Sequence, residues 1–253
     1  MRTNLMRSLA LAALLTAACQ TTSAAPPAPT ASSAHIVSAV ADAGRPAADK
    51  DLDDARKPAD MMAFAEVQPG DKVGELIPSA GFMTRVLSKS VGPTGHVYLL
   101  NRPPAAGRAP GFQPILDDKT NYPNVSFIPT DFTTIAAPEP LDLVWTSQNY
   151  HDMHNPGSNL DIAKANKAVF DALKPGGIYV VLDHQSAPGV DFDATLHRID
   201  GAKVKAEVLA AGFEFVGENN VLRNPNDPKD KGVFDPSIRR RTDQFILKFK
   251  KPG

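Results

Sequence analysis

The stretch from Glu66 to Asn101 constrains the fold most, because it follows the pattern of a strand, a tight turn, a helix and a second strand. Val73–Ile77 and Gly95–Leu100 are short apolar runs, and Phe82–Ser90 between them has the apolar spacing of a helix. Pro78–Gly81 (Pro-Ser-Ala-Gly) forms the turn that follows the first run. The sequence therefore predicts a βαβ unit, whose small-residue corner commonly binds a nucleotide-like ligand.

Apolar runs continue to alternate with helical patterns along the rest of the chain. Further strands are expected at 125–128, 141–146, 178–182, 213–221 and 242–248, and further helices at 57–67, 159–173 and 199–211. Such alternation predicts an α/β fold with a seven-stranded, mostly parallel sheet and helices on both faces. The last two strands look like a hairpin, which would make the C-terminal strand antiparallel.

The N-terminal region differs in composition from this pattern. Two arginines and the apolar run Leu9–Leu15 precede small residues, as in a secretory signal. The only cysteine, Cys19, stands where a bacterial lipoprotein signal would place it; ordinary cleavage near Ser23–Ala25 is the alternative. We therefore expect a signal peptide at 1–19, export to the periplasm, and membrane anchoring through lipidated Cys19. An Ala-, Pro-, Ser- and Thr-rich, disordered tether is expected at 20–50.

Residues 51–253 are long enough for one α/β domain. The formal net charge of the chain is −1, which argues against a nucleic-acid partner held by bulk electrostatics. After the signal, no apolar run is long enough to span a membrane. A small molecule is the expected partner, and no oligomeric state is predicted.

Four strings in this order resemble the class I S-adenosylmethionine-dependent methyltransferases. They are VQPGDKVGEL at 67–76, GPTGHVYLLN at 92–101, LDLVWTSQNYHD at 141–152 and ALKPGGIYVVLD at 172–183. The resemblance covers about 57–252 and is strongest to a group of secreted bacterial proteins predicted to be methyltransferases. It implies a Rossmann-like sheet, S-adenosylmethionine as the cofactor, and methyl transfer to an unidentified small molecule or envelope component.

The resemblance also implies roles for individual residues. Glu75 takes the place of the acid that organises the corner, and Asn101 the place of the acid that holds the ribose hydroxyls. Residues implied to contact the cofactor are Glu75, Pro78, Ser79, Ala80, Gly81, Asn101, Asp131, Phe132 and Gln148. Residues implied at the methyl-transfer side are Asn149, Tyr150, His151 and His184.

Two departures from the family pattern concern the cofactor. Ser79 and Ala80 stand in places where the family has glycine, which permits a positive φ or a close backbone approach to the ligand. Asn101 replaces a carboxylate, so it has one acceptor oxygen and no charge to strengthen hydrogen bonds from both ribose hydroxyls. We therefore predict weaker cofactor binding than is usual in the family.

Histidines and acids cluster after the two strands predicted at 141–146 and 178–182. Because neighbouring parallel strands end at the same edge of a sheet, we expect these side chains to share one pocket. His151 or His184 could act as a general base. A second interpretation makes His151, His154, Asp183 and His184 metal ligands, although His-x-x-His spacing is weakly specific and no metal is among the expected cofactors. A third is that these side chains only cap helices and pin loops.

Three functions remain open at this point. The first is an exported S-adenosylmethionine-dependent methyltransferase. The second is a non-catalytic periplasmic binding protein on the same fold, which the altered corner and Asn101 favour. The third is a metal-dependent enzyme. The number of polar and ionisable side chains expected around one cleft favours an enzyme.

Overall fold

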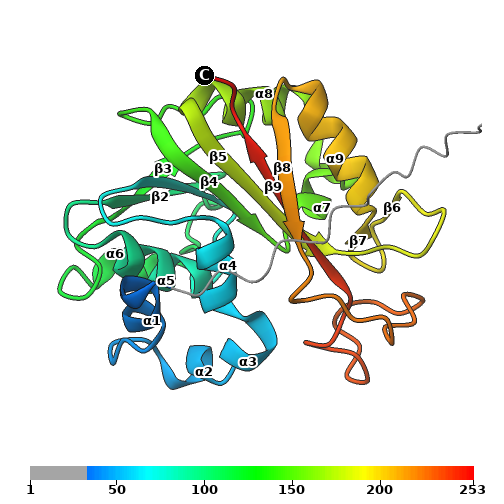
Figure 1. Ribbon diagram of the computed structural model, residues 1–253, viewed down its shortest axis with the longest axis horizontal. Helices are drawn as coiled ribbons and strands as arrows, with labels where there is room; N and C mark the ends of the chain where they lie inside the picture. The colour runs from blue at the N-terminus through cyan, green and yellow to red at the C-terminus, as the bar shows by residue number, and fades with distance from the viewer. Residues whose placement is uncertain (1–32) are drawn as a thin grey trace, which may run out of the picture.

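The computed structural model describes residues 33–253, which form a seven-stranded sheet in the order β3-β2-β1-β4-β5-β9-β8 (Figure 1). The strands are β1 (Lys72–Leu76), β2 (His96–Asn101), β3 (Val125–Pro129), β4 (Leu141–Ser147), β5 (Leu173–His184), β8 (Glu214–Asn219) and β9 (Gln244–Lys250). The pairs from β3 to β5 are parallel, whereas β9 is antiparallel to both β5 and β8. The predicted Rossmann-like, mostly parallel sheet is confirmed. Its strand order reverses between β1 and β4, where open α/β sheets bind ligands.

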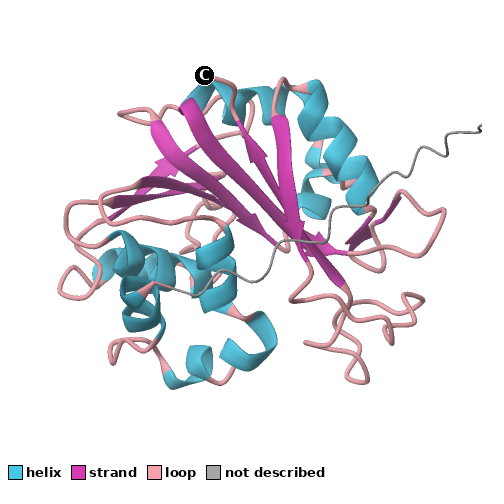
Figure 2. Ribbon diagram, in the orientation of Figure 1, coloured by secondary structure: helices cyan, strands magenta, loops and turns pink. Residues whose placement is uncertain are grey.

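Helices cover both faces of the sheet (Figure 2). The first group comprises α1 (Ala34–Val40), α2 (Ala47–Lys50), α3 (Asp53–Arg56), α4 (Pro58–Phe64), α5 (Phe82–Val91) and α6 (Gln113–Asp117). The second comprises α7 (Tyr150–Met153), a short 3-10 helix (Pro156–Ser158), α8 (Ile162–Ala172) and α9 (Gly201–Ala210). A separate two-stranded sheet pairs β6 (Phe192–Asp193) with β7 (Arg198–Ile199).

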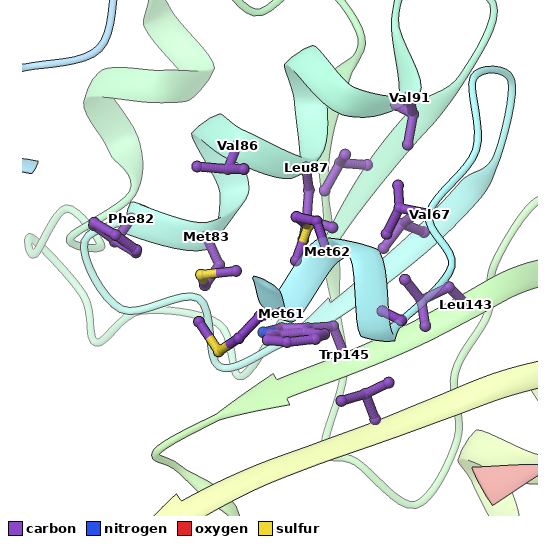
Figure 3. Close-up of a cluster of buried hydrophobic side chains, with 14 of the residues drawn as sticks. Met61, Met62, Val67, Phe82, Met83, Val86, Leu87, Val91, Leu143 and Trp145 are labelled. Carbon is purple, nitrogen blue, oxygen red and sulfur yellow. The ribbon is translucent and has the colours of Figure 1, made fainter. Parts of the chain in front are cut away.

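Each face of the sheet has its own apolar core. On one face, α1, α4 and α5 pack on β1 and β4, and Figure 3 shows Met61 beside Trp145 of β4, with Met83 of α5 nearer Met61. The apolar spacing that predicted α5 supplies this contact, since Met83 and Leu87 lie one turn apart on its buried face. On the other face, α7, α8 and α9 pack on the same central strands. The sheet is thus buried on both faces, and a ligand site is expected at the ends of its strands.

The N-terminal segment differs from its prediction. Residues 33–50, expected to belong to a disordered tether, include α1 and α2, and Ile36 and Ala39 are buried against the core. The Arg45 guanidinium is also buried and donates to both carboxylate oxygens of Asp53, at 2.8 and 2.6 Å. The Ala-rich composition concealed a short apolar helix face that docks on α5. The expected signal peptide, Cys19 and residues 20–32 lie outside the described residues.

Several element boundaries also differ from prediction. The helix expected from Asn159 begins at Ile162, because the Asp161 side chain caps it by accepting from the amide of Lys164. β5 starts at Leu173, so the turn-like Lys174–Gly177 lies within the strand. Residues 223–241 form a long irregular segment between β8 and β9. Within 33–253, no helix combines the length and apolar character needed to cross a membrane.

Candidate functional site

The corner between β1 and α5 has an unusual backbone. Ile77, Ser79 and Gly81 all have a positive φ, of 51°, 52° and 79°. Ser79 and Ala80 were predicted to replace glycines of the family pattern, but the left-handed positions are Ile77 and Ser79, and Ala80 is not among them. A left-handed conformation is strained for any residue with a β-carbon, and most of all for a β-branched one. The alternating pattern keeps the shape of a glycine corner with only one glycine.

Neighbouring elements hold this corner in place. The amide of Ile77 donates to the carbonyl of Leu100 in β2 at 2.9 Å, and the side-chain amide of Asn149 donates to the carbonyl of Ile77 at 2.8 Å. Behind the corner, a β-carbon at Gly81 would lie 2.1 Å from Ile115 of α6. Gly81, which was expected to contact the cofactor, is therefore a packing position whose own surface faces α6.

Glu75 lies beneath the corner as a buried carboxyl group. It is 3% exposed, accepts a 2.5 Å hydrogen bond from the Thr84 hydroxyl of α5, and forms no ion pair within the described chain. Burial raises the pKa of Glu75 to about 8, against the opposing effects of the Thr84 hydrogen bond and the Arg85 charge. A buried carboxyl group of this kind is ready to pair with a cationic group of a ligand.

A cavity of about 420 Å³ opens above the corner, a size within the usual range of ligand sites. The corner supplies Glu75, Leu76, Ile77, Pro78, Ser79 and Ala80 to its lining, and α5 supplies Phe82 and Met83. The ends of β4 and β5, together with α7, supply Ser147, Gln148, Asn149, His151, Asp152 and His184. The remaining lining comes from Asp49, Leu52 and Arg56 of the N-terminal segment and from the loop residues His197, Val233 and Phe234.

Backbone strain concentrates around this cavity. Of the ten non-glycine residues with positive φ in the described chain, four line it: Ile77, Ser79, Gln148 and His197. Such conformations cost about 1–3 kcal/mol each and persist where the surrounding structure holds them, often at functional sites. The strain thus marks the same region that the strand order indicates.

His151 is fixed by Asp183 of β5. The carboxylate oxygens of Asp183 accept from the His151 amide and from its Nδ1, both at 2.8 Å. With Nδ1 donating to Asp183, Nε2 faces the cavity side and has a lone pair there when the ring is neutral. Burial lowers the pKa of His151, but the charge and hydrogen bond of Asp183 and the charge of Asp152 outweigh burial, so the net shift is upward.

His184 and Gln148 complete the wall opposite the corner. His184 Nδ1 lies 2.8 Å from the Thr242 hydroxyl, and burial lowers the pKa of His184 to about 4, so its ring is neutral near pH 7. The side-chain amide of Gln148 donates to Gln244 of β9 at 2.7 Å. These side chains offer hydrogen bonds without a charge.

His197 and Asp152 stand beside His151 at the mouth of the cavity. His151 Nε2 is 3.3 Å from His197 Nδ1 and 3.4 Å from Asp152 Oδ1, and His197 Nδ1 is 3.8 Å from Asp152 Oδ1. The side chains of His197 and Asp152 are 34% and 39% exposed, against 4% for His151. One buried and two accessible ligand atoms therefore converge at this point.

Two neighbours of His151 point elsewhere. Tyr150 is buried in the other core, where its hydroxyl donates to Glu207 at 3.0 Å and accepts from Asn166 at 2.8 Å. His154 Nε2 also meets Glu207, at 3.0 Å. Neither residue lines the cavity, so Tyr150 stands apart from the other expected catalytic residues.

Three expected cofactor contacts also lie outside the cavity lining. Asn101 ends β2, and its carbonyl accepts from the amide of Thr130. The Asp131 carboxylate is used in a local turn, where it accepts from the amide and hydroxyl of Thr133, each at 2.8 Å. Phe132 is buried against Leu76 in the second core. The cavity extends from the corner toward the N-terminal segment rather than toward these residues.

The wall made by the N-terminal segment was not predicted from the sequence. Asp49 pairs with Arg85 of α5 at 3.0 Å, which anchors α2 beside the corner. Arg56 stacks on the Phe82 ring with 4.7 Å to its centroid. Burial, together with the charge of Arg240, lowers the pKa of Arg56. The charge pattern of 49–56 was the available signal in the sequence, but residues 49 and 50 were predicted from composition to belong to the tether.

No protein-family model matches the sequence, and no curated protein is similar to it in sequence. Solved structures do match. A SAM-dependent methyltransferase from Aquifex aeolicus is 17% identical with a TM-score of 0.57, and the match covers 82% of this chain and 98% of that one. The glycopeptide N-methyltransferase MtfA in complex with S-adenosyl-L-methionine is 14% identical (TM-score 0.54; 80% and 87% covered). The cyclase SpnF is 17% identical (TM-score 0.57; 86% and 91% covered). These similarities establish the fold, which serves more than one reaction.

Proposed function

We propose that the protein is an S-adenosylmethionine-dependent methyltransferase that acts on a small molecule or an envelope component. The observation that carries the proposal is the corner after β1. Its alternating left-handed residues, its buried carboxyl group and its cavity lie together at the point where the strand order reverses. Methyltransferases are among the solved structures with this fold, and MtfA was solved with this cofactor.

The residues at the corner fit the amino-acid end of the cofactor. Among the described residues, Glu75 is a buried carboxyl group without an ion-pair partner, and an ammonium group would supply that partner. The exposed Ser79 and Ala80 leave the backbone of the corner open to a ligand. When bound, S-adenosylmethionine supplies a methyl group activated by its positively charged sulfur. We assign Glu75, Pro78, Ser79 and Ala80 to holding it.

The ribose and adenine side fits less well. Asn101 lies at the same edge of the sheet as the corner, since Leu100 beside it pairs with Leu76 at the end of β1. However, Asn101, Asp131 and Phe132 are all absent from the cavity lining. This supports the expectation of weak cofactor affinity, because fewer polar contacts are in place before binding.

The rim of the cavity would hold the methyl acceptor. It consists of Gln148 and Asn149 after β4, His151 of α7 and His184 at the end of β5. Asn149 already bonds the carbonyls of Ile77 and Ser147, so we assign it to positioning the corner relative to the rim. Methyl transfer depends mainly on proximity and alignment of the reacting atoms, which a rim fixed by buried hydrogen bonds provides.

A non-catalytic binding protein is the second candidate. The strained Ile77 and the position of Asn101 outside the cavity lining favour it. The buried Asp183–His151 pair favours an enzyme, because burying two ionisable groups together is costly without a use for them. Export and anchoring through Cys19 remain part of the proposal and rest on residues outside the described range.

Titration calorimetry tests the proposal directly. The purified protein is titrated with S-adenosylmethionine and with S-adenosylhomocysteine, alongside Glu75→Ala as the corner variant and Glu139→Ala as a surface-carboxylate control. We expect both ligands to bind the wild type and the control, and binding to be lost in Glu75→Ala. Absence of heat at millimolar ligand would support the binding-protein candidate, and unchanged affinity in a folded Glu75→Ala variant would refute the assignment of Glu75.

A further inference from the structure

The three ligand atoms at the cavity mouth have the spacing of a metal centre. Bonds of 2.0–2.2 Å to a tetrahedral zinc-like ion place neighbouring ligand atoms about 3.3–3.6 Å apart. The separations among His151 Nε2, Asp152 Oδ1 and His197 Nδ1 are 3.3, 3.4 and 3.8 Å. All three atoms lie within 4.8 Å of one another. An ion could therefore bind with small side-chain adjustments.

We propose that His151, Asp152 and His197 bind one divalent transition-metal ion of the zinc or cobalt type. Two imidazoles and one carboxylate form a donor set that favours such ions over Mg²⁺ and Ca²⁺, because the latter take mainly oxygen ligands. The set differs from the ligands considered from the sequence. His154 is bonded to Glu207 and His184 Nδ1 faces Thr242, and the cluster contains neither residue.

Asp183 prepares His151 for this role. A metal-binding histidine usually donates its other ring N–H to a carboxylate, which fixes the ring and leaves the second nitrogen free for the ion. Asp183 does this at 2.8 Å and is itself fully buried in β5, where it also accepts from the amides of His151 and His184. The arrangement is more than a local surface cluster, because the central sheet holds it.

His197 is held from the opposite side. Its backbone has a φ of 57°, and the next residue, Arg198, forms a fully buried ion pair with Asp227 of the long loop. The His197 ring packs edge-on against Phe234. The strained conformation and its buried anchor direct the ring at His151. Strain that orients a side chain in this way is typical of functional sites and not of solvent-facing loops.

The geometry leaves one coordination position open. Three protein ligands and one free position are typical of catalytic zinc sites, whereas structural sites have four protein ligands. All three residues line the cavity, so a fourth ligand would reach the ion from the cavity. On the proposed function, the ion would take an acceptor hydroxyl as its fourth ligand and lower the pKa of that hydroxyl as a Lewis acid. This role rests on methyl transfer; binding of the ion does not.

Cobalt(II) titration of tag-free, chelator-treated protein tests the proposal, because four-coordinate Co²⁺ gives intense visible absorption bands. We expect one equivalent to bind the wild type with these bands. His197→Ala should lose them, with affinity reduced about 100-fold or more, and Asp183→Asn should weaken binding about 10–100-fold. The matched control is His154→Ala, which removes a histidine three positions from His151 and should titrate as the wild type does.

Absence of four-coordinate bands in the wild type, or equal affinity in a folded His197→Ala variant, would overturn the proposal. Thermal melting of His197→Ala shows whether its fold is intact. Calorimetry with S-adenosylmethionine on the same samples separates the two claims. Cobalt binding without cofactor binding supports the metal site and contradicts the methyltransferase, and the reverse result contradicts only the metal site.

Discussion

The corner after β1 and the rim after β4 and β5 face the same cavity but are held by different interactions. In the corner, Ile77 and Ser79 have strained backbones, and Ser79 and Ala80 are exposed. In the rim, His151 and Asp183 are buried and joined by two hydrogen bonds. The corner is shaped by backbone conformation and the rim by side-chain contacts.

This difference predicts different behaviour on ligand binding. Contacts to a ligand can offset the strain of the corner, so the corner should gain order when the cofactor binds. The rim needs no such gain, because its side chains are already oriented by buried partners, as preorganised reaction sites are. Substitutions in the corner and in the rim test this difference separately.

The largest effect is expected at the rim, from Asp183→Ala. The change leaves the amides of His151 and His184 and the Nδ1 of His151 without their acceptor. Breaking a buried network of this kind should lower the free energy of unfolding by about 3–5 kcal/mol, measured by urea denaturation. Asp152→Ala, at a half-exposed carboxylate of the same rim, is the control and should cost about 1 kcal/mol or less. Similar losses in both variants would show that the rim is not held as described.

The pH dependence of stability tests the carboxyl group under the corner. The pKa of Glu75 is about 8 in the folded protein and ordinarily 4.5, so the folded state binds the proton more tightly. Its contribution to stability is therefore full below about pH 4.5 and is lost as the pH rises toward 8. Between pH 5 and pH 7 we expect the loss to be about 2 kcal/mol. Urea denaturation should show that the free energy of unfolding of the wild type falls by this amount over this pH range, whereas that of Glu75→Gln does not. The same pH dependence in both proteins would contradict the burial of an unpaired carboxyl.

Two neighbouring substitutions in the corner should have opposite signs. Ser79→Gly removes the β-carbon at a left-handed, exposed position and should stabilise the protein by about 1 kcal/mol. Ala80→Gly, one residue away without a positive φ, should destabilise it by about 0.4–1 kcal/mol through the entropy of the unfolded chain. Thermal melts of both variants read out the sign. Destabilisation by Ser79→Gly would mean that the corner is not strained there.

Tyr150→Phe should have the smallest effect on ligand binding, because it changes side-chain contacts outside the cavity. The change removes hydrogen bonds to Glu207 and Asn166 in the second core, at a cost of about 1 kcal/mol. Because Tyr150 does not line the cavity, binding of S-adenosylhomocysteine should be unchanged in calorimetry. A large loss of affinity would show that Tyr150 contributes to ligand binding.

The sequence predicted the sheet and the position of the corner, because strand and helix periodicities follow directly from burial on two faces. It could not predict the left-handed backbone of Ile77, since local preference disfavours it and tertiary contacts from Leu100 and Asn149 impose it. The directions of Tyr150 and His154 were partly predictable. They are four residues apart, so they share a side of α7 and its last turn, away from His151. The wall formed by 49–56 depended on long-range docking that composition does not record.

The most direct test of the central claim is an NMR measurement with S-adenosylmethionine labelled with carbon-13 at its methyl group. If the cofactor binds at the corner with its methyl group toward the rim, the labelled methyl protons should show nuclear Overhauser effects to the ring protons of His151 or His184. Bound cofactor whose methyl protons show effects only to residues outside the cavity, or a failure to bind at millimolar concentration, would contradict the account.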